Sequence, residues 1–231
     1  MKNLLAAFSI LFMAFNLNAE VLTNVSMKGE AYNSKGQLAY IETHTFKKLP
    51  SGEITEIQTK YHNADGKLIA EVESTFSKDP FIPDTVFIDH RFNEKQELNY
   101  DKTSKTVTMK LTDKDGKVKT NSIPRSENMV SGQGFHNYIL KHYDDKKSDI
   151  KFIVLTKLDY YSFYFEKESS KVEGQRKFIL KVSNWVLRAL VKEIVVEYRD
   201  IDHSLMSFSG LTNIDSDSHD SQIYNIKISY L

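Results

Sequence analysis

The sequence predicts a mainly β, antiparallel domain, and three observations support this fold class. Short turns, each built on an Asn or Asp followed by a glycine, recur along the first half of the chain. Apolar and polar residues alternate between those turns, as they do in strands with one buried face. A single apolar stripe with helical spacing follows, and long segments rich in β-branched and aromatic residues come after it.

The recurring turns divide residues 21–123 into hairpins. The segments "NSKGQ", "NADGK" and "DKDGK" each begin with an Asn or Asp and place a glycine where the backbone needs a positive φ. Their unequal intervals argue against a solenoid or a propeller. We therefore expect an antiparallel meander. Two prolines in "PFIPDT" (80–85) interrupt it and favour an edge or a crossover there.

One amphipathic helix is expected at residues 132–146, because its apolar positions form a single stripe that must be buried against a sheet. The stripe consists of Phe135, Tyr138, Ile139, His142 and Tyr143. Ser131 is a suitable N-cap, and the lysines at 146 and 147 suit the negative end of the helix dipole.

Strands are expected at 149–168 and 177–183, and both parities of the first are apolar. A strand that is apolar on both faces is covered on both faces. A short helix at 184–191 follows, and the β-branched run after it returns the chain to a strand. The segments 203–214 and 221–231 form a last hairpin.

The first nineteen residues have the pattern of a secretory signal peptide. Lys2 precedes a short apolar run, and the small residue Ala19 ends the segment before Glu20. The run is shorter than the roughly 20 residues that span a bilayer, so an uncleaved anchor is the lesser alternative. We expect cleavage to leave one domain (20–231) in the periplasm or secreted, with no later membrane span. The absence of cysteine excludes disulfides and a lipoprotein anchor.

Composition and motifs argue against several functions. The 31 basic and 31 acidic residues leave no positive excess for nucleic acid. No phosphate loop, nucleophile elbow or zinc motif is present, so we expect neither an enzyme nor a cofactor nor a metal site. The segment "DSDSHD" (215–220) lacks the central glycine and final glutamate of helical calcium loops. It is expected to be a solvated turn, with weak calcium binding left open.

The candidate ligand-binding residues are large apolar side chains in the C-terminal half of the chain. Exposing each one to water would cost about 1.5–3 kcal/mol, so a core, a ligand or a partner must cover them. Aromatic residues fill a sheet core as readily as they line a cleft, and both interpretations stay open at this point. The candidates are Phe152, Phe163, Phe165, Phe178, Trp185 and Leu187.

Several phrases, taken in order, resemble a family of exported bacterial β-rich proteins of unknown function. They are "KGEAYNSKGQLAYIETHTF", "YHNADGKLIAEVESTF", "GFHNYI", "FIVLTKLDYYSFYF", "SNWVLRALVKEIVVEYRD" and "FSGLTNI", and the resemblance covers nearly all of the mature chain. It implies a strongly curved antiparallel sheet or incomplete β-barrel with a helix on its concave side. This architecture is broadly similar to that of the envelope carriers that move lipoproteins and hold acyl chains.

Three functional hypotheses follow. The first is a soluble periplasmic protein that binds an apolar ligand, a lipid or acyl chain, on the concave face of the sheet. The second is an envelope scaffold that docks a protein partner through the same apolar surface. The third is a divergent hydrolase, which requires a cleft where His90 with Asp89, or His44, meets other catalytic groups.

Overall fold

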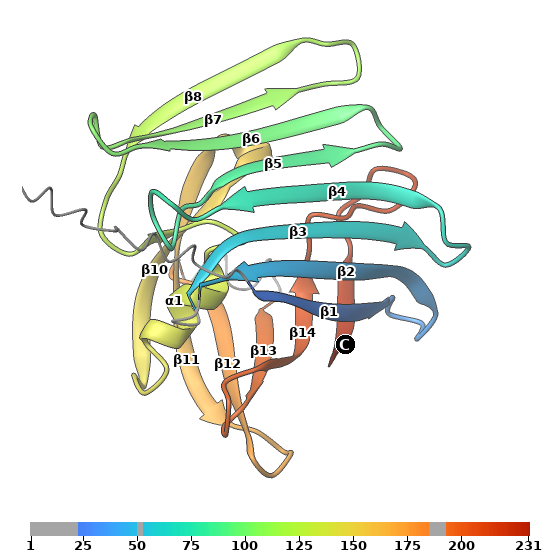
Figure 1. The fold of residues 1–231 in the computed structure, drawn as a ribbon, viewed down its shortest axis with the longest axis vertical. Helices are drawn as coiled ribbons and strands as arrows, with labels where there is room; N and C mark the ends of the chain where they lie inside the picture. The colour runs from blue at the N-terminus through green and yellow to red at the C-terminus, as the bar shows by residue number, and fades with distance from the viewer. Residues whose placement is uncertain (1–22, 50–52, 185–192) are drawn as a thin grey trace, which may run out of the picture.

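The computed structural model describes residues 23–49, 53–184 and 193–231, and they form a mainly β fold. The 15 strands of these residues belong to one open sheet, in the order β8-β7-β6-β5-β4-β3-β2-β1-β15-β14-β13-β12-β11-β10-β9 (Figure 1). Neighbouring strands are antiparallel, except that β9 runs parallel to β10. The predicted fold class, a strongly curved antiparallel sheet or incomplete barrel, is confirmed.

The two halves of the sheet are joined by the pairing of β1 with β15. The first half contains β1 (Thr23–Tyr32), β2 (Leu38–Lys48), β3 (Ile54–Asn63), β4 (Leu68–Thr75), β5 (Asp84–Asp89), β6 (Glu94–Asp101), β7 (Thr106–Thr112) and β8 (Val118–Pro124). The second half contains β9 (Met129–Val130), β10 (Lys147–Val154), β11 (Asp159–Ser169), β12 (Gln175–Val182), β13 (Ile194–Arg199), β14 (Leu205–Leu211) and β15 (Ile223–Tyr230). Among the described residues, the helices are α1 (Phe135–Lys141) and the 3-10 helix η1 (Leu155–Lys157).

The three predicted Asn/Asp–Gly turns are confirmed. The side chain of Asn33 accepts hydrogen bonds from the backbone N–H groups two and four residues later, at 3.0 Å each. The same arrangement recurs at Asn63 and Asp113. The glycine of each turn has a positive φ, as this geometry requires: Gly36 (75°), Gly66 (83°) and Gly116 (78°).

The sheet curves so strongly that its two halves lie across each other, with α1 on the concave face (Figure 1). Ile150 and Phe163 are cross-strand partners on the face of β10 and β11 that contacts α1. Ile153 and Tyr160 are partners on the opposite face, and they pack against Leu98 and its neighbours from β6 and β7. Both faces of β10 and β11 are therefore covered, as the apolar residues on both parities predict.

The amphipathic helix exists but is shorter than the predicted 132–146. It begins after Gly134 and not after Ser131, because residues 131–134 form a turn in which the Ser131 N–H donates to the Phe81 carbonyl at 2.9 Å. It ends before His142, and Lys147 already pairs with Glu166 in the sheet. The predicted cap and the C-terminal boundary were therefore wrong.

The predicted strand at 149–168 is two strands joined by η1. Leu158 ends this turn in the left-handed conformation, with φ of 53°. A leucine is an unusual residue for positive φ, and the turn contains no glycine or proline. The hairpin therefore carries none of the usual sequence signals. The predicted short helix at 184–191 lies outside the described residues except for Asn184.

The buried side chains form three clusters that touch one another. The first lies between β1–β5 and β15, the second between α1 and β10–β13, and the third between β6, β7 and β10. Leu205 and Phe208 of β14 contact the first and second clusters, and Phe81 contacts the second and third. The three clusters are therefore continuous, and α1 covers the part of the concave face that β10–β13 form.

Candidate functional site

The position of α1 is fixed by a close backbone approach. Gly134 lies against the segment before β5, where a Cβ atom would overlap the carbonyl group of Phe81. Asn137 also donates from its side chain to the Pro80 carbonyl at 2.9 Å. These contacts hold the helix so that its apolar stripe points into the second cluster.

Two of the predicted ligand-binding residues, Phe165 and Phe178, lie beneath α1 and are fully buried. The Tyr138 ring contacts Phe165 edge-on, with ring centroids 6.1 Å apart, and Tyr143 contacts Phe178 at 5.3 Å. The helix covers Phe165 through Tyr138, and the turn after the helix covers Phe178 through Tyr143.

Two others, Phe152 and Phe163, are half-buried and face the same side of the sheet. Phe152 contacts Phe135 of α1 at 5.8 Å between ring centroids and Phe163 at 6.1 Å. Tyr161 is the cross-strand partner of Phe152, and it remains 41% exposed. We call Phe135, Phe152, Tyr161 and Phe163 the aromatic strip. Exposure increases along the strip, from the buried Phe135 through the half-buried Phe152 and Phe163 to the exposed Tyr161. The strip therefore connects the buried core with the surface at one end of β10 and β11.

Alternation along β10 and β11 predicted two members of this strip, Phe152 and Phe163, as ligand-binding residues. Phe135 was predicted as part of the helical stripe, and Tyr161 was not among the predicted ligand-binding residues. Its parity matches that of Phe163 and Phe165, so the alternation could have identified it. Trp185 and Leu187, the remaining predicted site residues, lie outside the described residues.

Polar groups lie on the same face at β2 and β3. The Nδ1 atom of His44 is 2.9 Å from the Thr59 hydroxyl, and its Nε2 atom is 3.1 Å from a Glu42 carboxylate oxygen. The second contact has poor hydrogen-bond alignment, so it is better described as an electrostatic contact. Glu42 fits there because its cross-strand neighbour is Gly29, where a Cβ atom would lie 2.6 Å from the Glu42 side chain.

The Thr59–His44–Glu42 series has the order of a catalytic triad, in which a hydroxyl, an imidazole and a carboxylate follow one another. It lacks the solvent access that the hydroxyl of such a triad needs. Thr59 is fully buried, so a substrate cannot reach its hydroxyl. His90 lies in the turn directly after β5, is exposed, and contacts Glu71 at 3.1 Å, whereas Asp89 is buried and pairs with Arg91. Neither arrangement provides an accessible nucleophile with its base.

His136 lies on α1 beside β13. Its Nδ1 atom is 3.2 Å from the Tyr198 hydroxyl, and the two rings stack at 5.6 Å. Burial lowers the pKa of His136 to about 4, with a smaller contribution from the positive charge of Lys48. Burial also raises the pKa of Tyr198 far above its ordinary value, so both groups are uncharged at neutral pH.

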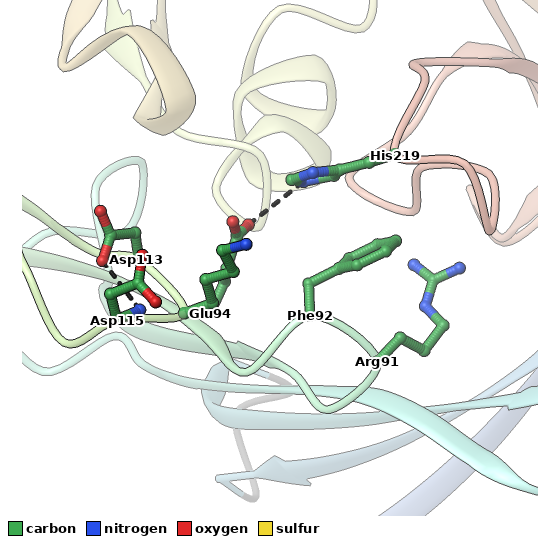
Figure 2. Close-up of a pocket in the computed structure, with 7 residues that line it drawn as sticks. Arg91, Phe92, Glu94, Asp113, Asp115 and His219 are labelled. Carbon is green, nitrogen blue, oxygen red and sulfur yellow. Dashed lines mark hydrogen bonds and ion pairs between the residues drawn. The ribbon is translucent and has the colours of Figure 1, made fainter.

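A separate hollow of about 400 Å³ lies on the outside, where the 215–220 segment meets two hairpin turns (Figure 2). Arg91 is fixed in its wall by Asp89 at 2.6 Å and by the Asp215 carbonyl at 2.9 Å. His219 stacks on Phe92 at 4.2 Å and contacts Glu94 at 3.2 Å. The groups that line this hollow are therefore largely paired with one another.

The "DSDSHD" segment is a turn held by hydrogen bonds among its own residues. The Asp220 N–H donates to the Ser216 hydroxyl at 3.1 Å, and the Ser218 hydroxyl donates to Asp220 at 2.9 Å. Within 23–49, 53–184 and 193–231, no three His, Asp or Glu side chains converge as metal ligands.

No known protein family and no curated protein matches this sequence. The resemblance to exported bacterial β-rich proteins therefore stays a prediction. Across the described part of the chain, no helix combines the length and the apolar character that a bilayer span requires.

Proposed function

We propose that the mature chain binds a lipid or acyl chain on the concave face of its curved sheet, in the periplasm or outside the cell. The observation that supports this function best is the aromatic strip, which carries the apolar surface of the core out to solvent. Tyr161 is 41% exposed at its outer end, and Phe152 and Phe163 keep part of their surface uncovered.

The energetics favour an apolar ligand at the aromatic strip. Covering roughly 100 Å² of apolar surface contributes about 2.5 kcal/mol, so the binding free energy of an alkyl chain increases with the length that it lays along these rings. The outer hollow is a poor alternative for such a ligand, because charged side chains line most of it (Figure 2).

A titration with a neutral fluorescent probe, N-phenyl-1-naphthylamine, tests the proposal. We expect the probe to bind the wild-type chain and to be displaced by long-chain acyl lipids. Tyr161→Ser should weaken binding about five- to tenfold, since it removes an apolar ring at the outer end of the strip. Because Tyr161 is exposed, the substitution should leave the melting temperature unchanged.

Ile201→Ser is the matched control, because Ile201 is 89% exposed on the turn between β13 and β14, away from the strip. It removes an exposed apolar side chain of similar character and should leave probe binding unaltered. Equal affinities for wild type and both variants, or no binding at all, would contradict the proposal.

The same variants distinguish a protein-docking role. If Tyr161→Ser abolishes capture of a protein partner while acyl lipids never displace the probe, the strip serves a protein interface. That outcome would replace lipid binding with the scaffold hypothesis.

A further inference from the structure

Lys48 places a cation on the concave face of the sheet. It ends β2 on the same side as Glu42, His44 and Phe46, as the alternation along the strand requires. The side chain is half-buried, and its Nζ atom lies 5.9 Å from the centre of the Phe46 ring. The ammonium group therefore lies near an aromatic ring on the same face of the sheet.

No carboxylate of the described residues forms an ion pair with Lys48. Its neighbour Lys47, on the opposite face of β2, contacts Glu56 at 2.7 Å. The buried acid on Lys48's own face, Glu42, contacts His44 instead. A cation beside apolar surface, with no carboxylate of the described residues paired to it, leaves its charge available to an anion from outside the chain.

The first turn of α1 connects the Lys48 cation with the aromatic strip. Phe135 of this turn belongs to the strip and contacts Phe152. The next residue, His136, lies within electrostatic range of Lys48, whose charge adds to the lowering of its pKa by burial. Figure 1 shows the end of β2 beside α1. A ligand whose chain lies on the strip can therefore bring a polar head to Lys48 around this turn.

We propose that the ligand of the concave face carries an anionic head, a carboxylate or a phosphate, which pairs with Lys48. This inference rests on the proposed function and adds the chemical class of the ligand. His136 is uncharged at neutral pH and offers no competing cation, so Lys48 supplies the charge that selects the head.

The test compares three competitors with the same acyl chain in the probe-displacement assay. A fatty acid provides a carboxylate, a lysophosphatidic acid provides a phosphate, and a monoacylglycerol is neutral. We expect at least one anionic lipid to displace the probe at about a tenfold lower concentration than the monoacylglycerol. The better of the two anionic lipids identifies the head. Lys48→Gln should remove this preference, whereas Lys47→Gln should keep it.

The probe itself is neutral, so its direct binding reports the apolar site independently of Lys48. If the three lipids displace it equally from wild type, or if Lys48→Gln leaves the preference intact, the anionic head is refuted while the apolar site remains. If the probe and lipids do not bind at all, the proposed function fails and this inference fails with it.

Discussion

Replacing Gly134 by alanine should undock α1 from the sheet. The new methyl group would overlap the Phe81 carbonyl, and a backbone group cannot rotate away as a side chain can. Overpacking typically costs about 1–3 kcal/mol, and a shift of the helix would also loosen its buried residues Phe135, Tyr138 and Ile139. We therefore expect Gly134→Ala to lower the free energy of unfolding by about 3 kcal/mol. For a domain of this size, that lowers the melting temperature by about 6–12 °C.

Thermal and urea unfolding followed by circular dichroism measure this loss. Gly132→Ala is the matched control, because a Cβ atom at Gly132 meets no atom within 4 Å and the residue is exposed. The control should be neutral, or more stable by up to about 1 kcal/mol, since alanine restricts the unfolded chain. A Gly134→Ala variant as stable as the control would refute the account of how α1 is held.

Three further predictions concern the interior. Gly29→Ala should cost about 1–3 kcal/mol, measured by urea unfolding, because its methyl group would displace the Glu42 carboxylate, and Glu42→Ala should restore part of the loss. Phe178→Ala should cost about 3–5 kcal/mol in the same assay, since Phe178 is fully buried; a loss below about 1 kcal/mol would mean that its site is loosely packed. Because His136 has a folded pKa of about 4 and an unfolded value of 6.5, the unfolded state binds more protons between these values. Its contribution to stability is full above pH 6.5 and declines as the pH falls toward 4, by at most about 2 kcal/mol at pH 5. His136→Gln should flatten this part of the stability curve, and an unchanged curve would show that the imidazole is not buried as described.

Local signals in the sequence predicted most of the first half of the sheet. The Asn33, Asn63 and Asp113 turns are self-contained, because each side chain organises its own backbone and each glycine supplies the positive φ. Such turns set the register of the flanking strands, so alternation then identifies the buried face.

The missed features depend on contacts between distant segments. The start of α1 is set by Phe81, about fifty residues earlier, so the local cap at Ser131 gave the wrong boundary. The β10–β11 turn places Leu158 in the left-handed region, and its side chain packs against the third cluster. Tertiary packing can stabilise such a residue, but the local sequence does not indicate it.

The candidate site could be predicted only in part. The apolar parity of β10–β12 identified Phe152, Phe163, Phe165 and Phe178, but it could not tell which rings α1 covers. Which rings are covered and which stay exposed follows from where the helix packs on the sheet. The role proposed for Lys48 was not predictable either. It depends on the nearby carboxylates having other partners, since Glu42 contacts His44 and Glu56 contacts Lys47.

Native mass spectrometry of the mature chain, purified without detergent, tests the central claim most directly. The account predicts a bound acyl lipid in the wild-type spectrum, retained in Ile201→Ser and depleted in Tyr161→Ser. A wild-type chain that emerges free of lipid and takes up none when incubated with fatty acid, lysophosphatidic acid or monoacylglycerol would contradict it.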